Sequence, residues 1–377
     1  MTDELPGTPI VMDNGSLLSK NGFAGDKLPR SVFPTLITYP KNQRMSGTEH
    51  EIKDHYIGEE ATGLHDALTC LYPIEYGIIN DWDGMEKLWH YTFYENLKIS
   101  PENHPVLLTE VPLNPAKNRE KSAEILFESF NCPAVYLTSK ATLALQASYR
   151  TGGLVVDIGD TATFIVPIEE GFSISHSIYR LDIGGRDITD YLRELLISQG
   201  KIHENSVRNE HIRDYKEEFS YVCLDVPREL ARHKKRPHAG KKYTFPSGET
   251  VIIGKERFIA PEMLFNPAIV GKEDQPVGDA IVNSIMANSV DIRRKLCENI
   301  VLTGGSSLFP GLKERLHKEL VEEFPEHVKI CVIAPPDRQY AAWIGGSILA
   351  PSPEFRNSWV TKQEYQKEGA RIIYRCF

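Results

Sequence analysis

The sequence predicts an α/β protein with a duplicated fold, and three observations support this prediction. An apolar run that ends in Asp-x-Gly occurs twice, at residues 9–16 (PIVMDNGS) and at residues 153–160 (GLVVDIGD). The second run begins near the middle of a chain of 377 residues, a length at which proteins usually form two domains. Strand-like and helix-like segments alternate along the rest of the chain, which is typical of α/β folds.

Each of the two runs is interpreted as a buried strand that ends in a carboxylate, Asp13 in the first and Asp157 in the second. The glycine that follows allows a tight turn, and the backbone amides of such turns bind phosphate oxygens. Two halves of this kind that face each other would surround a polyphosphate, with both aspartates holding a hydrated Mg²⁺. The paired motifs therefore predict a nucleotide site.

Apolar patterns predict the other elements in order along the chain. Strands are expected at residues 32–39, 106–109, 134–137, 162–167 and 300–302, and helices at residues 118–131 and 140–149, from about residue 187 and from about residue 310. The last helix places Leu312, Leu316, Leu320 and Phe324 on one face. The polar residues 41–54 and the basic residues 232–242 are expected to form exposed loops.

Composition narrows the class of protein. The apolar fraction of 41% and the charged fraction of 25% are ordinary for a soluble globular protein, and the net charge of −9 argues against nucleic acid as a direct partner. Six cysteines lie far apart without a CxxC pair, so free thiols are expected. Residues 1–6 do not resemble a signal peptide, and no apolar run approaches the ~18 residues of a membrane span, so we expect an intracellular protein.

Together with other short motifs, these runs make the sequence resemble the actin family from Ile10 to Phe377. The matching stretches are residues 13–16 (DNGS), 22–26 (GFAGD), 72–75 (YPIE), 113–115 (LNP), 185–187 (GRD), 303–305 (TGG), 343–349 (WIGGSIL), 362–365 (KQEY) and 376–377 (CF). Their number and order favour a divergent actin or an actin-related protein over a sugar kinase or a chaperone ATPase. The resemblance implies an actin-like duplicated ATPase fold, with two lobes, or four subdomains, around a nucleotide cleft.

The resemblance also implies where the lobes begin and end. Residues 1–147 and 339–377 would form the first lobe, the small or outer domain of subdomains 1 and 2, with residues 34–72 as subdomain 2. Residues 148–338 would form the second lobe, the large or inner domain of subdomains 3 and 4, with about residues 184–273 as subdomain 4.

The family binds ATP or ADP with Mg²⁺ or Ca²⁺, and the resemblance assigns the residues that would do so here. The metal would be held through water by Asp13 and Asp157. The first phosphate loop would be Asn14, Gly15, Ser16 and Leu17, with Lys20 reaching the phosphates, and the second would be Gly159, Asp160, Thr161 and Ala162. The base and ribose would lie against Gly185, Arg213, Lys216, Glu217, Gly304, Gly305, Ser306, Phe309 and Gln339.

Two residues depart from the family at its catalytic positions. Lys140 stands where the family carries the glutamine that orients the attacking water, and Phe164 replaces a nearby histidine. Lysine only donates hydrogen bonds and phenylalanine has no polar group, so neither accepts a proton from water. With Asp157 as the third residue there, we expect at most a slow ATPase of the actin type. The alternative is that Lys140 merely binds the γ-phosphate or Asp157 while slow hydrolysis continues from the metal alone.

The expected function is that of a cytoskeletal protein that binds Mg-ATP and assembles into filaments with itself or with other actin-family subunits. Residues 266–272, with Ile269 and Val270, would supply the plug between filament strands. The loop at residues 41–54 is mostly polar, and Met45 is the apolar side chain expected to insert into the next subunit. This polar loop favours an alternative, a non-filamentous scaffold subunit of a dynein-associated or chromatin-remodelling complex.

Partners and location follow from the same resemblance. Actin-binding proteins would dock in a groove at Ile344, Ile348 and Leu349, although Pro351 and Pro353 alter the backbone that follows. Residues 232–242 are either a solvated surface or a site for an acidic partner. The expected location is the cytoplasm and its cytoskeleton, with the nucleus as the alternative.

Overall fold

The computed structural model describes residues 5–40, 53–63, 68–204, 206–235, 240–246 and 248–376. The chain divides into two compact units, Met1–Arg150 with Tyr340–Phe377, and Thr151–Gln339. Each unit has an apolar core of its own. Within the described ranges, no helix is both long enough and apolar enough to cross a lipid bilayer.

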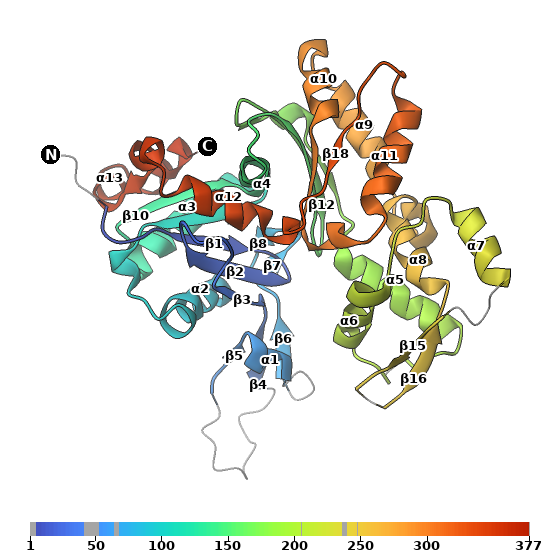
Figure 1. Ribbon diagram of the computed structural model, residues 1–377. Coiled ribbons are helices and arrows are strands. Elements are labelled where there is room, and N and C mark those ends of the chain that lie inside the picture. Colours follow the sequence, from blue (N-terminus) through green and yellow to red (C-terminus); the bar gives the residue numbers. More distant parts are fainter. Residues whose placement is uncertain are drawn as a thin grey trace, which may run out of the picture. The chain divides into compact units, whose positions relative to one another are not determined.

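The first unit is built on a six-stranded sheet with the order β19-β10-β9-β1-β2-β3 (Figure 1). Its strands are β1 (Ile10–Asn14), β2 (Leu18–Phe23), β3 (Ser31–Pro34), β9 (Val106–Glu110), β10 (Ala134–Ser139) and β19 (Val360–Thr361). Strand β1 pairs antiparallel with β2 and parallel with β9. It is fully buried, as expected for a strand that forms the centre of a covered sheet.

A helix from the end of the chain anchors this sheet. Figure 1 shows α12 (Ala341–Leu349, red) lying along β1 (blue), and α12 also packs against α4 (Lys140–Ala147). The fully buried Trp343 donates its indole N–H to the carbonyl oxygen of Val11 at 3.0 Å. The C-terminal segment is thereby fixed to the first strand.

The remaining elements of the first unit are short. They are the strands β4 (Ile37–Pro40), β5 (Tyr56–Ile57), β6 (Leu68–Leu71), β7 (Ile74–Glu75) and β8 (Ile78–Ile79), and the helices α1 (Glu59–Gly63), α2 (Trp82–His90), α3 (Ala116–Glu124) and α13 (Lys362–Glu368). Strands β5, β4 and β6 form a small separate sheet, and β7 pairs with β8. Helices α2 and α3 continue into single π-helical turns at Tyr91–Asn96 and Ile125–Ser129.

The second unit repeats this strand connectivity. Its sheet has the order β13-β12-β11-β17-β18, with β14 also paired to β12. The strands are β11 (Gly153–Ile158), β12 (Thr163–Glu169), β13 (Phe172–Ser173), β14 (Tyr179–Leu181), β17 (Ile300–Thr303) and β18 (Val332–Ile333). Strand β11 pairs antiparallel with β12 and parallel with β17, as β1 does with β2 and β9. The two Asp-x-Gly runs therefore occupy equivalent places in two sheets, as the sequence predicts.

Helices pack beside the second sheet, and β15 and β16 form a small separate hairpin in the same unit. Figure 1 shows α9 (Val277–Met286), α10 (Val290–Glu298) and α11 (Leu312–Glu323) beside the sheet. The other elements are α5 (Gly185–Ser198), α6 (Asn209–Phe219), α7 (Val226–Lys235), α8 (Glu256–Ile259), β15 (Lys241–Thr244) and β16 (Thr250–Ile253). On α11, Leu312, Leu316 and Leu320 are fully buried, which confirms the predicted apolar face.

Two predicted elements differ in the structure. Residues 32–39 do not form one strand, because β3 ends at Pro34 and β4 begins in another sheet at Ile37. The amide of Thr35 still donates to the carbonyl of Leu17 at 2.8 Å, and the chain leaves the large sheet only after this residue. The predicted helix at residues 118–131 begins at Ala116, and its regular part ends at Glu124.

The predicted basic loop at residues 232–242 is also wrong at both of its ends. Helix α7 continues to Lys235 with Arg232, His233 and Lys234 in its last turn, and β15 begins at Lys241. Cationic side chains favour a helix C-terminus because they interact well with the helix dipole. Residues 236–239 of this segment, and residues 41–52 of the other predicted loop, lie outside the described residues.

Thr361 and Glu364 form a capping box at the start of α13, and this box predicts how the stability of the protein depends on pH. The two terminal guanidinium nitrogens of Arg375, Nη1 and Nη2, donate to Glu364 at 2.6 and 3.0 Å, and the Thr361 amide donates at 2.8 Å. The hydrogen bonds from Arg375 lower the pKa of Glu364 to about 2. Since the unfolded chain has a pKa of about 4.3 there, the stabilisation is complete above that pH and is lost as the pH falls toward about 2.

We therefore expect Glu364→Gln to be destabilising at pH 7, with a difference from wild type that shrinks between about pH 5 and pH 3. Thermal unfolding across this range measures the difference. Glu354→Gln, which removes an exposed carboxylate, is the control and should leave the pH dependence unchanged. A constant difference between wild type and Glu364→Gln would contradict the prediction.

Candidate functional site

The first predicted phosphate loop is a tight turn between β1 and β2. The Gly15 amide donates to the carbonyl of Leu18 at 3.0 Å, which closes the turn. A Cβ atom at Gly15 would lie 3.0 Å from that same carbonyl oxygen, so the position leaves little room for a side chain. The Asn14 side chain accepts a hydrogen bond from the Ser19 hydroxyl at 2.8 Å, which holds the start of the turn.

The second predicted phosphate loop has the same local geometry. Between β11 and β12, the Gly159 amide donates to the carbonyl of Ala162 at 3.0 Å. A Cβ atom at Gly159 would again lie 3.0 Å from the accepting oxygen. The two Asp-x-Gly motifs thus build equivalent turns, each at the carboxyl end of a central strand, where α/β proteins usually bind ligands.

Asp13, at the end of β1, is buried between two lysines. Its Oδ2 lies 3.1 Å from Lys20 Nζ, and its Oδ1 lies 3.1 Å from Lys140 Nζ. Burial alone raises the pKa of this carboxyl, but the ammonium groups of Lys140 and Lys20 outweigh burial and hold the pKa below its usual range. Asp13 is therefore ionised at neutral pH and is neutralised by the protein itself.

Three neighbouring strand ends supply this cluster. Strand β9 lies between β1 and β10, and α4 begins at Lys140 directly after β10. The hydroxyl of Thr109, at the end of β9, donates to Asp13 Oδ1 at 2.8 Å, and Lys140 Nζ also donates to the carbonyl of Asn14 at 2.6 Å. The sequence analysis did not identify Thr109, although a polar residue at the end of an apolar strand is a recognisable signal.

A divalent metal fits poorly at Asp13. Hydrated Mg²⁺ is attracted by carboxylates with unpaired charge, whereas both oxygens of Asp13 already accept from ammonium groups or a hydroxyl. In the described parts of the chain, no group of three or more His, Cys, Asp or Glu side chains is placed to hold a metal ion. Asp157, the other predicted ligand, lies in the second unit.

In the second unit, three segments meet at the carbonyl of Gly159. This oxygen accepts from the Gly185 amide at 3.0 Å and from the Ser306 hydroxyl at 2.7 Å. The Arg186 guanidinium pairs with Asp160 at 3.1 Å, which fixes the second turn to the start of α5. Gly159, from the second predicted phosphate loop, therefore lies beside Gly185 and Ser306, which are predicted to contact the base and ribose.

Lys216 extends this cluster from α6. Its Nζ donates to the carbonyl of Gly185 at 2.7 Å, and the side chain is buried. Burial lowers the pKa of Lys216. Arg213 and Glu217 lie on the same helix, 4.0 Å apart between Nε and Oε1. Of the three α6 residues predicted to contact the base and ribose, Lys216 therefore contacts Gly185, while Arg213 and Glu217 lie on the same helix.

The glycine turn after β17 packs directly against the end of β11. Gly304 has a φ of +87°, and a Cβ atom there would lie 2.3 Å from the carbonyl oxygen of Ile158. The amide of Gly304 donates to the carbonyl of Arg338 at 3.2 Å, which places Gln339 in the segment beside this turn. Arg338 also donates to the carbonyl of Ser307 at 2.9 Å, a contact that the sequence analysis missed. Phe309 is buried.

The predicted catalytic positions are Lys140, Asp157 and Phe164, and of these only Asp157 can accept a proton. Phe164 lies on β12 directly opposite Asp157 in the strand register, and it is buried. Lys140 is an ammonium donor that is already bound to Asp13 and Asn14. The side chains at the positions of the family's glutamine and histidine can bind anions or pack, but they cannot take a proton from water.

The family model described as actin matches residues 5–377. The chain belongs to the actin family. Members of the actin family generally bind ATP or ADP with a divalent metal, and they are generally cytoskeletal, cytoplasmic or nuclear.

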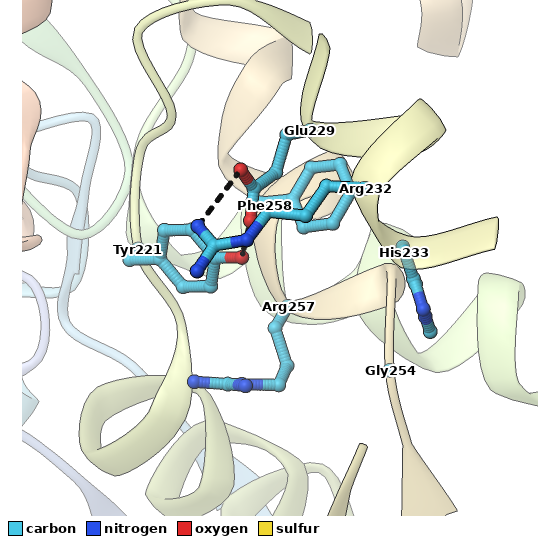
Figure 2. A pocket seen from close by; sticks show the side chains of 7 residues that line it. All are labelled: Tyr221, Glu229, Arg232, His233, Gly254, Arg257 and Phe258. Carbon is cyan, nitrogen blue, oxygen red and sulfur yellow. Dashed lines mark hydrogen bonds and ion pairs between the residues drawn. The ribbon is translucent and has the colours of Figure 1, made fainter. Parts of the chain in front are cut away.

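This actin-family chain also has a pocket that contains none of the predicted nucleotide residues. Figure 2 shows it in the second unit, with a volume of about 310 Å³, lined by Tyr221, Glu229, Arg232, His233, Gly254, Arg257 and Phe258. The Tyr221 hydroxyl donates to Glu229 at 2.9 Å, and the Arg257 guanidinium lies 5.1 Å from the centre of the Tyr221 ring. With Arg232 at 3.8 Å from Glu229, the lining holds two guanidinium groups and one carboxylate.

Gly304 and Gly305 provide a matched pair for testing the turn after β17. We expect Gly304→Ala to lower the free energy of unfolding by about 1–3 kcal/mol, because the new side chain meets Ile158 in a strained backbone conformation. Gly305→Ala should change it by less than about 1 kcal/mol, since no atom lies within 4 Å of its Cβ position. Urea unfolding of both variants measures the difference. Equal effects would contradict the described packing.

Proposed function

We propose that this actin-family chain binds ATP or ADP with residues of both units. The observation that carries the proposal is the pair of equivalent glycine turns, at Gly15 and Gly159, each at the end of a central strand. The Gly15 and Gly159 amides close these turns, and turns of this kind bind phosphate oxygens through the backbone amides of neighbouring residues. Lys20 and Lys140 supply positive charge beside the first turn. Gly185, Lys216 and the turn at Gly304 are proposed to contact the base and ribose.

Thermal unfolding with and without ATP tests this proposal. A ligand that binds only the folded state raises stability by RT ln(1 + [L]/Kd), which is about 4 kcal/mol at a thousandfold excess over Kd. We expect ATP to raise the melting temperature, and Lys20→Gln to reduce that rise because it removes a phosphate-facing charge. The exposed Lys121, which pairs with Glu124 on α3, gives the control variant Lys121→Gln. An unchanged melting temperature in wild type would overturn the proposal.

The same proposal makes the chain a slow ATPase at most. Hydrolysis requires a group that orients water and takes its proton, and neither Lys140 nor Phe164 can do so. Lys140 instead neutralises Asp13 and stabilises charge near the phosphates. We therefore propose that bound ATP lasts longer on this protein, before hydrolysis and phosphate release, than it does on ordinary actin.

Lys140→Gln combined with Phe164→His should accelerate phosphate release. Such a pair restores an amide that aligns water and a group that accepts a proton, and one acid–base group is typically worth about 10²- to 10⁴-fold in other enzymes. Single-turnover release of phosphate measures the rate, with Lys140→Arg as the control that retains the positive charge. A wild-type rate equal to that of ordinary actin would contradict impaired hydrolysis.

We further propose weak self-assembly through the plug at residues 266–272. In the structure this segment contains a 3-10 turn, Pro267–Val270, in which Ile269 is 38% exposed and Val270 packs against the core. Lys272 pairs with Asp187 at 2.6 Å, which ties the plug to the start of α5. One exposed isoleucine offers little apolar area, at about 25 cal/mol per Å², to offset the cost of association.

The assembly proposal predicts a higher critical concentration than that of ordinary actin. Grafting an apolar actin-type loop onto residues 41–54 should lower it, because more apolar area is then buried between subunits. In the grafted protein, Ile269→Asp should abolish assembly, whereas Ile252→Asp, at an exposed isoleucine on β16, should not. Sedimentation and electron microscopy measure the result. Long filaments of the unmodified protein at low micromolar concentration would contradict weak assembly.

The alternative function is that of a scaffold subunit in a larger complex that contains actin-family proteins. Of the three residues proposed for the partner groove on α12, Ile348 is 38% exposed, while Ile344 and Leu349 pack against the core. One exposed isoleucine offers little apolar area to a docking partner, which favours the scaffold function. A pelleting assay at increasing protein concentration separates the two functions.

A further inference from the structure

Two lysines share the one buried carboxylate of Asp13. The side chains of Asp13, Lys140 and Lys20 are 4%, 12% and 15% exposed, so water screens their charges only weakly. Since two ammonium groups face one carboxylate, the cluster is positive before any ligand binds. The resemblance to actin places an uncharged glutamine at the position of Lys140, so the extra positive charge belongs to this chain.

Helix stability does not explain the presence of Lys140. It is the first residue of α4, and the N-terminus of a helix disfavours a positive charge because the helix dipole is positive there. The contacts with Asp13 Oδ1 at 3.1 Å and with the carbonyl of Asn14 at 2.6 Å hold the ammonium group in place. Lys140 is therefore fixed by the first phosphate turn rather than by its own helix.

The cluster still has hydrogen-bond donors for an anion. Each ammonium group has three N–H donors. In the described contacts, Lys20 uses one donor on Asp13, and Lys140 uses one on Asp13 and one on Asn14. The remaining donors lie beside the turn that begins at Asn14, whose amides suit phosphate oxygens.

We propose that Lys140 takes the place of the divalent cation as the charge that offsets Asp13 and the phosphates, so that ATP binds this chain with little dependence on Mg²⁺. This inference rests on the proposed nucleotide function and concerns how the charge of the triphosphate is neutralised. Unlike a metal ion, the ammonium group of Lys140 is already in place beside the first turn before the nucleotide binds. A hydrated metal ion gains little from a carboxylate whose charge is already paired.

The test compares ATP affinity in millimolar Mg²⁺ and in excess EDTA, by displacement of a fluorescent ATP analogue from the full chain. We expect the affinity of wild type to change by less than about threefold between the two buffers, because a buried ammonium group near the phosphates replaces the charge of the ion. In Lys140→Gln, we expect EDTA to weaken ATP binding by at least about tenfold, since Asp13 then lacks one of its two cations.

Two control variants separate the charge of Lys140 from its other effects. Lys140→Arg keeps the charge and should remain insensitive to EDTA. Lys121→Gln removes an exposed lysine elsewhere in the first unit and should behave like wild type. Thermal unfolding without nucleotide shows that each variant is folded, and the wild-type comparison stands even if Lys140→Gln does not fold.

The possible outcomes separate the role of Lys140 from nucleotide binding itself. Wild-type protein that binds ATP in Mg²⁺ but loses tenfold or more in EDTA would overturn the role of Lys140 and leave nucleotide binding intact. A Lys140→Gln variant as insensitive to EDTA as wild type would overturn it equally. Absence of ATP binding in both buffers would overturn the proposed function itself.

Discussion

The ion-paired carboxylate of Asp13 is the constraint on which the first half of the candidate site depends. A buried charge is tolerated only when it is paired and hydrogen-bonded, and this one is held by Lys20, Lys140 and Thr109. These partners come from β2, from the start of α4 and from the end of β9, so the cluster fixes adjoining elements around the first turn. Removing any one partner changes the electrostatics of the whole turn.

The duplicated sheets have kept the same framework and diverged in charge. In both, a central strand carries an aspartate one residue before its end, a glycine turn follows, and the neighbouring parallel strand carries a threonine at or next to its end. Thr109 donates to Asp13, whereas Thr303 donates to the carbonyl of Arg338 at 3.0 Å. Phe164 beside Asp157 adds no polar group. The two glycine turns that we propose to bind phosphate are thus alike in both units, whereas Lys140 and Phe164 offer no group that could accept a proton from water.

The sequence alone was sufficient to predict the local features. Asp-x-Gly after an apolar run predicts both turns, because strand, carboxylate and glycine are adjacent in the chain. The contact between Lys140 and Asp13 was not predictable in this way, since it depends on β10, β9 and β1 lying side by side. The basic residues before Lys235 were misread as loop because polarity alone does not distinguish a solvated helix end from a loop.

The central claim is that Lys140 remains bound to Asp13 when a nucleotide is present. A crystal structure of the chain with ATP and Mg²⁺ tests it most directly. We expect Lys140 Nζ to stay within hydrogen-bonding distance of Asp13 Oδ1, where it now lies at 3.1 Å, and to contact a phosphate oxygen. A Lys140 side chain turned away from Asp13, with the water shell of the metal ion on the Asp13 carboxylate, would contradict it.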